Sequence, residues 1–427
     1  MTSKREVDPS GSFAGGTRFF REDAKLNETI ERARQAALDI LQPSKKELEH
    51  GLELHKNSVV WDAYGFAPRA AIDGDALQRA LESGASEEEL RDMSEDMAMT
   101  RMVTDPVERR EFKEAWEAAG VTCIFQNAGV ESQDPLQIIK RLSRFTYVAD
   151  ALDEFLIRAA FPQDVERAHA EGKHCFYMSS NGVPLRQRWD SLEEELTYIR
   201  TFFYLGHRIM HLTYNRRNMI GDGCAEPGNA GLSDFGRAVV AELNRVGVIA
   251  DVAHSGWRTS KEVAEASSKP VVASHTGCAA VNEHIRCKPD EVIRAIVDSG
   301  GFIGICCIPE FLGGSKDIRA LFDHIDYVAK RFGVDHVAIG TDAAYTSRQM
   351  AVEQKKVSHR RRVRHHWEYF WPEGALGGRI DAKARLSLSW TNWPLFTVGL
   401  VQRGYSDDDI QKILGGNVLR VAKAVLA

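Results

Sequence analysis

Eight short apolar runs, separated by segments with apolar residues at helical spacing, constrain the fold of this chain more than any other feature. A parallel strand that is covered on both faces reads as a continuous apolar run. Eight such strands, each followed by a crossover helix, are what a (β/α)₈ barrel requires. The runs lie at residues 58–64, 120–126, 174–180, 208–214, 247–254, 270–275, 301–309 and 335–342.

An open doubly wound sheet is the other α/β architecture to consider. Such sheets have fewer strands, and many carry a glycine-rich phosphate turn after the first strand. Neither a G-x-G-x-x-G nor a G-x-x-x-x-G-K-[ST] pattern occurs in the sequence. We therefore predict the α/β class and a (β/α)₈ TIM barrel with a helical N-terminal extension.

Segments outside the alternation predict additions to the barrel. Residues 1–50 are expected to form an N-terminal arm and helix, with a break at Pro43. Residues 51–427 are expected to form the barrel domain. Within it, an acidic helical insertion is expected near 73–110 and a long loop near 343–378.

Composition limits the partners of the chain. Its 427 residues are 43% hydrophobic and 27% charged, and the formal net charge is -6, which attracts neither nucleic acid nor an anionic membrane. The sequence contains neither an apolar run of signal-peptide length near its start nor a membrane-spanning run of about 18 apolar residues. Its seven cysteines lack C-x-x-C spacing, which fits free thiols in a reducing compartment. We expect a cytoplasmic protein with a small-molecule substrate and with no nucleic-acid or membrane partner.

Polar residues at the ends of the apolar runs indicate where function lies, because barrel active sites form at the carboxyl ends of the strands. His254 and His275 end two successive runs, Asp342 ends the last, and Asp62 and Tyr64 lie at the end of the first. Two imidazoles and a carboxylate that converge on one face can bind Zn²⁺. A histidine at a strand end can equally be a hydrogen-bonded structural residue, and the spacing leaves both interpretations open.

Four stretches stand in a fixed order along the chain: "GLSDFGRAVVAELNRVGVIADVAHSG", "PVVASHTGCAAVNEHIRCKPDEVI", "GVDHVAIGTD" and "GGNVLRV". Together they resemble the membrane (renal) dipeptidase family of the amidohydrolase superfamily. The likeness extends from about Asn57 to Ala427 and is strongest between Gly231 and Asp342. It implies a TIM barrel of metal-dependent hydrolase type that commonly forms homodimers. It also implies a site where two zinc ions, bridged by a glutamate and a water, hydrolyse dipeptides.

Four site residues of that family have counterparts here. The resemblance places the two histidines of the second zinc ion on His254 and His275. It places the aspartate that handles the proton of the attacking water on Asp342. The arginine that binds the substrate carboxylate falls on Arg286.

Four other positions depart from the family pattern. Its His-x-Asp at the end of the first strand falls on Tyr64 and Phe66 in "VVWDAYGFAP", its bridging glutamate on Asn181, and a substrate-facing histidine on Tyr214. A phenyl ring has no ligand atom, and a phenol must first lose a proton with a pKa near 10. We therefore expect no dinuclear zinc centre. Either one zinc or similar divalent ion binds the two retained histidines, or no metal binds.

Three function classes follow from these residues. The first is a dipeptidase-family hydrolase that acts on a small amide, peptide-like or carboxylate-bearing substrate at a remodelled site. The second is a metal-free lyase, isomerase or hydratase that uses acid–base chemistry, and the third is a non-catalytic binding relative. For an enzyme, the expected catalytic residues are His254, His275, Asp342 and Tyr64, and the expected substrate-binding residues are Arg286, Tyr214, Asn181 and Phe66.

A basic and aromatic stretch at 355–371, which includes "KKVSHRRRVRHHW", follows the last apolar run. Such a patch can bind RNA, but in an acidic chain a solvated or subunit-interface loop is the commoner explanation. Because the stretch follows the last strand, it should lie at the mouth of the site. There it can act as a lid over an anionic or aromatic substrate.

Overall fold

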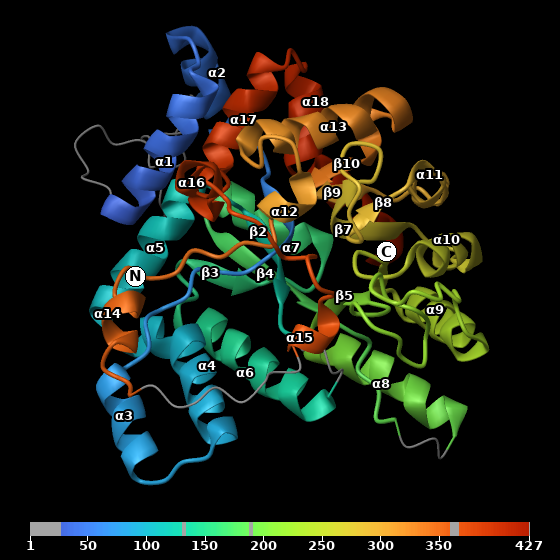
Figure 1. Cartoon of the computed structure of the whole chain (residues 1–427), viewed down its shortest axis with the longest axis horizontal. Coiled ribbons are helices and arrows are strands. Elements are labelled where there is room, and N and C mark those ends of the chain that lie inside the picture. The colour runs from blue at the N-terminus through green and yellow to red at the C-terminus, as the bar shows by residue number, and fades with distance from the viewer. Residues whose placement is uncertain (1–26, 130–133, 188–190, 359–366, 427) are drawn as a thin grey trace, which may run out of the picture.

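The computed structural model describes residues 27–129, 134–187, 191–358 and 367–426, which form a parallel barrel surrounded by helices (Figure 1). Eight strands follow one another in the order β1-β2-β4-β5-β6-β7-β9-β10. Each predicted apolar run overlaps one of them, so the predicted barrel is confirmed. Their bounds are β1 Trp61–Gly65, β2 Cys123–Asn127, β4 His174–Ser180, β5 His207–His211, β6 Ile249–Asp251, β7 Val271–Cys278, β9 Ile303–Ile305 and β10 Val337–Ile339.

Two further strands, β3 (Leu156–Arg158) and β8 (Cys287–Lys288), pair with β4 and β7 outside this ring. The sequence did not predict them. Two or three residues give too short a run for a periodicity to be recognised.

The first and last strands of the ring lie side by side. The backbone N–H of Asp342 donates to the carbonyl of Tyr64 at 2.9 Å, just beyond the end of β10. A Cβ added at Gly340 would lie 1.9 Å from the carbonyl oxygen of Ser274, so glycine is needed for β10 to approach β7 this closely. The ends of β1 and β10 therefore meet at one face, although they lie at opposite ends of the barrel sequence.

Helices surround the barrel on its outer side (Figure 1). Those between consecutive strands of the ring bury one apolar face against them, as the predicted crossover pattern requires. The helices are α1 Glu28–Leu41, α2 Lys45–Lys56, α3 Gly74–Glu82, α4 Glu87–Thr104, α5 Pro106–Ala119, α6 Pro135–Ala151, α7 Pro162–Glu171, α8 Leu192–Leu205, α9 Asp234–Val246, α10 Trp257–Ala266, α11 Asp290–Asp298, α12 Pro309–Leu312, α13 Ile318–Phe332, α14 Met350–Gln354, α15 Trp367–Phe370, α16 Ala382–Ser387, α17 Trp393–Gln402, α18 Asp407–Gln411 and α19 Asn417–Leu426.

The N-terminal helices pack against the C-terminal part of the chain. Helix α1 contacts α16, and α2 contacts α17. Asn392 supports this contact by donating a hydrogen bond from Nδ2 to the carbonyl of Ala33 at 2.9 Å. The part of the expected N-terminal arm and helix that falls on residues 1–26 lies outside the described residues.

Helices α3, α4 and α5 lie between β1 and β2 along the chain. Helix α4 packs against α5 and α6. The guanidinium of Arg144 on α6 is buried and pairs with Asp92, Glu95 and Asp96 of α4 at 2.8–2.9 Å. These contacts hold the insertion against the side of the barrel where β1 and β2 end.

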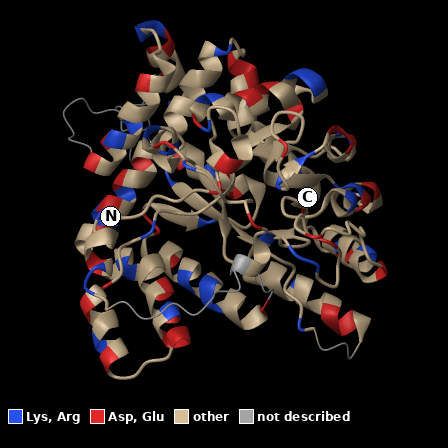
Figure 2. Ribbon diagram, in the orientation of Figure 1, with Lys and Arg blue, Asp and Glu red and all other residues tan. Residues whose placement is uncertain are grey.

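Acidic and basic residues are interspersed along the outer helices (Figure 2). None of the described helices is both long and apolar enough to cross a membrane. All seven cysteines are free thiols, and Cys224 alone among them is partly exposed. The expected cytoplasmic location and homodimer stay predictions.

Candidate active site

His254, three residues after β6, and His275, within β7, face each other. Their Nε2 atoms are 2.9 Å apart, and both rings are buried. The Nδ1 atom of His254 lies 2.6 Å from Oδ1 of Asn215. Because an amide oxygen only accepts, this Nδ1 carries the proton and the lone pair of the neutral ring lies on Nε2. Burial, and after it the charge of Arg286, hold the pKa of both histidines well below the usual range.

Arg286 lies against this pair with its side chain fully buried. Its Nη2 donates to the carbonyl of His275 at 3.0 Å and lies 3.3 Å from Nε2 of His254, while Nη1 donates to the carbonyl of Ala253. Its Nε has no hydrogen-bond partner, and none of the described carboxylates forms an ion pair with it. Arg286 is therefore a buried cation without a counter-ion in the described part of the chain.

Aromatic rings cover the two histidines. The ring of Tyr64 stacks on His275 with 3.9 Å between centroids, and the ring of Tyr214 stacks on His254 at 4.2 Å. The Tyr64 hydroxyl donates a short hydrogen bond to Oδ1 of Asn181. The structure therefore brings these five residues, all expected from the sequence, into one cluster.

Asp342 lies at the same face, three residues after β10. Its φ of 52° places it in the left-handed region, which a residue with a side chain enters at a cost of about 1–3 kcal/mol. Its backbone N–H bonds to Tyr64, as described above. Strain of this kind persists where the surrounding structure enforces it, which fits a functional position.

Two site residues were missed by the sequence analysis, His211 and Asp251. They are the last residues of β5 and β6, and neither is exposed to solvent. Nε2 of His211 lies 2.8 Å from Oδ2 of Asp251, and both residues lie beside His275. The available signal was a polar residue inside each apolar run. The prediction used the last residue of each run, Tyr214 or His254, which lies three positions further along.

Asp62 lies within β1 and has a structural role rather than a place in this cluster. Its Oδ1 accepts the backbone N–H of Thr341 at 2.9 Å, and its Oδ2 accepts the hydroxyl of the same residue at 2.6 Å. Trp390 donates to Oδ2 from Nε1 at 3.1 Å. The carboxyl group thereby joins the first strand to the end of the last one.

Asp62→Asn is expected to change how stability depends on pH. Burial raises the pKa of Asp62 to about 7, although hydrogen bonds from Thr341 and its neighbours lower it. Between about pH 4 and pH 7 the folded protein then binds more protons at this residue than the unfolded chain, so its contribution to stability falls as pH rises, by up to about 1.4 kcal/mol per pH unit. Urea unfolding should show that the free energy of unfolding falls less steeply between about pH 4 and pH 7 for Asp62→Asn than for the wild type. The exposed Asp153→Asn is the control, and an unchanged slope for Asp62→Asn would refute the raised pKa.

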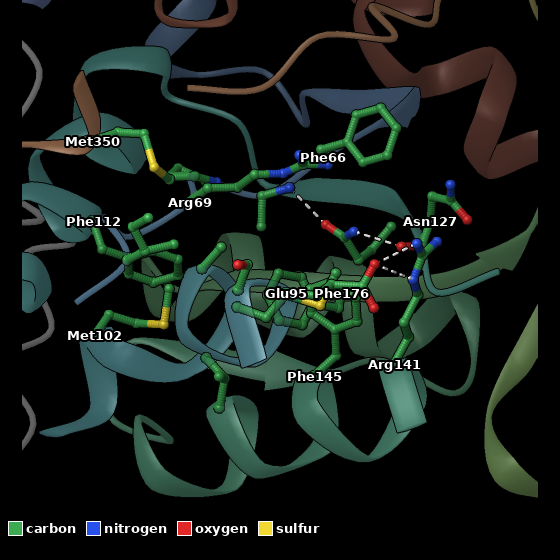
Figure 3. Close-up of a pocket in the computed structure, with 18 of the residues that line it drawn as sticks. Phe66, Arg69, Glu95, Met102, Phe112, Asn127, Arg141, Phe145, Phe176 and Met350 are labelled. Atoms are coloured by element: carbon green, nitrogen blue, oxygen red, sulfur yellow. Dashed lines mark hydrogen bonds and ion pairs between the residues drawn. The ribbon is translucent and has the colours of Figure 1, made fainter. Parts of the chain in front are cut away.

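Phe66 connects the cluster to a cavity. Its ring lies edge to face with Tyr64 at 5.8 Å between centroids, and it also lines a cavity of about 360 Å³ (Figure 3). Helices α4 and α6 supply nine of the other residues that line the cavity. The apolar part includes Met99, Met102, Phe112, Phe145 and Phe176.

Charged residues border the same cavity (Figure 3). The Nε of Arg141 pairs with Oε1 of Glu95 at 3.0 Å, and the guanidinium of Arg69 lies over the ring of Phe66 at 5.0 Å. A volume of this size with apolar walls and a few polar groups is typical of a small-molecule site.

Part of the segment after β10 crosses the cluster. The carbonyl of Phe370 accepts a hydrogen bond from Asn215 Nδ2 at 3.1 Å, and its ring meets Tyr214 edge to face at 5.2 Å. The carbonyl of Tyr369 accepts from Arg216 at 2.8 Å. The described end of the basic and aromatic stretch thus lies over Tyr214, while residues 359–366 lie outside the described residues.

Comparison with curated proteins finds dipeptidases. Dipeptidase verJ of Clonostachys rogersoniana is 30% identical over 230 residues, or 53% of this chain and 50% of that protein. Dipeptidase aclJ of Aspergillus oryzae is 28% identical over 277 residues, or 63% of this chain and 56% of that protein. The chain spans about half to three fifths of the length of the curated relatives it matches.

Solved structures agree on the fold. An amidohydrolase from Pseudomonas aeruginosa is 26% identical, with a TM-score of 0.62 and coverage of 88% of this chain and 99% of that chain. A metallopeptidase from Rhodobacter sphaeroides, liganded with a phosphinate mimic of L-Ala-D-Ala, has a TM-score of 0.59 at 17% identity, with 86% and 99% coverage. The sequence profile described as membrane dipeptidase (peptidase family M19) matches residues 84–363. Because this match covers more than half of the chain, the protein belongs to the membrane dipeptidase family, peptidase family M19.

Proposed function

We propose that this chain is a hydrolase that cleaves a small amide or peptide-like substrate bearing a carboxylate. The observation that carries the proposal is Arg286, the buried guanidinium without a described counter-ion. Burying a charge without a partner is costly, so its presence favours a ligand that supplies an anion. The dipeptidase relatives support the same class, because a dipeptide ends in a carboxylate.

We further propose that the site is remodelled from the dinuclear zinc centre that the family resemblance implies. The residues at that first position do not fit a second ion. The Tyr64 hydroxyl keeps its proton in the bond to Asn181, whose amide oxygen is thereby engaged, and Phe66 has no donor atom. Zinc sites in proteins are built from imidazole, thiolate and carboxylate ligands, none of which these three residues supply.

His254 is the group best placed to take a proton during hydrolysis. The lone pair on its Nε2 faces the interior of the cluster, and the bond from Nδ1 to Asn215 fixes the ring. As water adds to the amide carbonyl, the new C–O bond forms while Nε2 takes the water proton. That proton then passes to the leaving nitrogen as the C–N bond breaks. The hydroxyl of Tyr64 can exchange its bond to Asn181 for a bond to the oxyanion that develops.

A substrate screen tests the proposal. The protein is incubated with dipeptides, N-acyl amino acids and the same compounds with amidated carboxyl ends, with a chelator or with added Zn²⁺. Hydrolysis of the free-carboxylate compounds in preference to the capped ones is the expected result. Hydrolysis of capped compounds alone, or of none, would contradict the proposal.

A metal-free lyase, isomerase or hydratase is the second candidate function. It is favoured by the hydrogen-bonded Tyr64 hydroxyl beside two neutral histidines, which can serve as acid and base without a metal. In the same screen it predicts turnover that survives the chelator and yields no hydrolysis products. Binding of a carboxylate compound without any turnover would instead indicate the third class, a non-catalytic relative.

The cavity beside Phe66 is proposed to hold an apolar group of the substrate. Ala98→Trp on α4 would fill much of it, since Ala98 lies on its wall. KM for substrates with a large apolar group is expected to rise about tenfold or more, because lost apolar burial costs about 25 cal/mol per Å². Substrates with a methyl group in that position should be little affected. The exposed Glu88→Trp on the same helix is the control, and equal KM changes for both substrate sizes would contradict this use of the cavity.

A further inference from the structure

We propose that His211, Asp251 and His275 bind one divalent cation of the zinc type inside the barrel. One ligand atom from each residue lies within 4.8 Å of the others, and all three side chains are buried. His211 and Asp251 end the neighbouring strands β5 and β6, and His275 lies within the next strand, β7. This ligand set keeps His275 but replaces His254 with His211 and Asp251. The proposed metal site does not depend on whether the chain is a hydrolase.

The polar atoms of His211 and Asp251 support this site. Nε2 of His211 and Oδ2 of Asp251 form an ion pair at 2.8 Å, and neither atom has a hydrogen bond to any other group in the described part of the chain. Both residues are entirely shielded from solvent. Buried polar atoms usually satisfy their hydrogen-bonding capacity, so a buried imidazole and carboxylate that contact only each other leave room for a shared ligand. A cation accepts electron pairs from both at once.

Neighbouring groups orient two of the three ligands, Asp251 and His275. Oδ1 of Asp251 accepts the backbone N–H groups of Ala253 and Ser274 at 2.9 and 3.1 Å, which leaves Oδ2 to face His211. The Nδ1 atom of His275 lies 2.8 Å from the hydroxyl of Ser274, which leaves its Nε2 directed toward the cluster. Metal ligands in proteins are typically fixed in this way by hydrogen bonds to their other polar atom.

The distribution of charge favours this set over one built on His254. Nε2 of His254 lies 3.3 Å from the guanidinium of Arg286, whose positive charge opposes a second cation there. Asp251, in contrast, supplies a carboxylate close to His211 and His275. Two imidazoles and one carboxylate, with a fourth position open, are an established ligand set for zinc.

The test is the metal content and metal affinity of the full chain. The wild type is stripped with a chelator, reloaded with Zn²⁺ or Co²⁺, and examined by elemental analysis and by titration. We expect about one ion per chain. We also expect the affinity to fall more than about 100-fold in both His211→Asn and Asp251→Asn, which exceeds the 10–100-fold loss typical of residues behind the ligands. His254→Asn should stay within about tenfold of the wild type, as should His174→Gln, a buried histidine elsewhere in the barrel.

Three results would overturn the site. The wild type could bind no ion, or the folded His211→Asn and Asp251→Asn variants could bind it as tightly as the wild type. The third is a loss of metal affinity in His254→Asn alone. If a variant fails to fold, the anomalous scattering of a Co²⁺-loaded wild-type crystal decides the matter, since the ion must then lie between His211, Asp251 and His275. None of these measurements uses turnover, so the failure of this site and the failure of the proposed hydrolysis can be told apart.

Discussion

His254→Ala is expected to lower kcat by about 10²–10⁴-fold on the substrate that the screen identifies, which is the usual contribution of a general base. The neutral ring offers its Nε2 lone pair beside the buried guanidinium of Arg286. A substrate carboxylate that binds the guanidinium offsets the positive charge that holds the pKa of His254 down. The base therefore becomes stronger when substrate binds, and the measurement is steady-state kinetics on folded protein.

Tyr64→Phe is the companion variant, because it removes only the hydroxyl that bonds to Asn181. A smaller fall in kcat with little change in KM is expected, since a donor to an oxyanion acts mainly in the transition state. The exposed His50→Ala is the control for a histidine outside the cluster. If His254→Ala and Tyr64→Phe both retain the wild-type kcat, the cluster binds a ligand without catalysing a reaction.

Arg286→Met should lower kcat/KM for carboxylate-bearing substrates by at least about 100-fold, which corresponds to roughly 2.7 kcal/mol of transition-state stabilisation. The loss should be far smaller for the same substrates with an amidated carboxyl end. Arg286→Lys keeps the charge but lacks the planar fork that binds a carboxylate with two hydrogen bonds, so an intermediate value is expected. Equal losses on free and capped substrates would contradict a carboxylate partner.

The melting temperature of Arg286→Met provides a second test of the role of Arg286. Replacing a buried, uncompensated charge with an apolar side chain of similar size is often neutral or stabilising. Arg286→Met should therefore keep a Tm close to that of the wild type, despite losing its bonds to the carbonyls of Ala253 and His275. A large fall in Tm would indicate that Arg286 serves the fold rather than the substrate.

The sequence was sufficient to predict the barrel because its main signal is local. A strand such as β7 is buried on both faces and must be apolar along its length, whatever its neighbours are. The expected cluster of Tyr64, Asn181, Tyr214, His254 and His275 came from strand ends combined with the family resemblance, and the structure places these side chains together. Asp62, in contrast, looked like a site residue and proved to join β1 to the end of β10.

His211 and Asp251 show what the sequence left undetermined. Each interrupts an apolar run, but a single polar residue in a run does not reveal its partner, which stands on another strand. The sequence likewise does not show that Arg286 lacks a counter-ion among the described residues, because this depends on every group that packs around it. The cavity beside Phe66 could not be predicted from the sequence either, because it forms only where the helices between β1 and β2 pack against the barrel.

The sequence by itself determined the class of fold, the order of the strands and the face where polar side chains gather. These follow from burial and from the right-handed crossover of parallel strands, which act along neighbouring segments of the chain. The tertiary structure alone decided which polar atoms meet, which remain without partners, and which charge stays uncompensated. Hydrogen bonds and Coulomb interactions act over a few ångströms in space, and closure of the barrel brings together groups that lie far apart in the sequence.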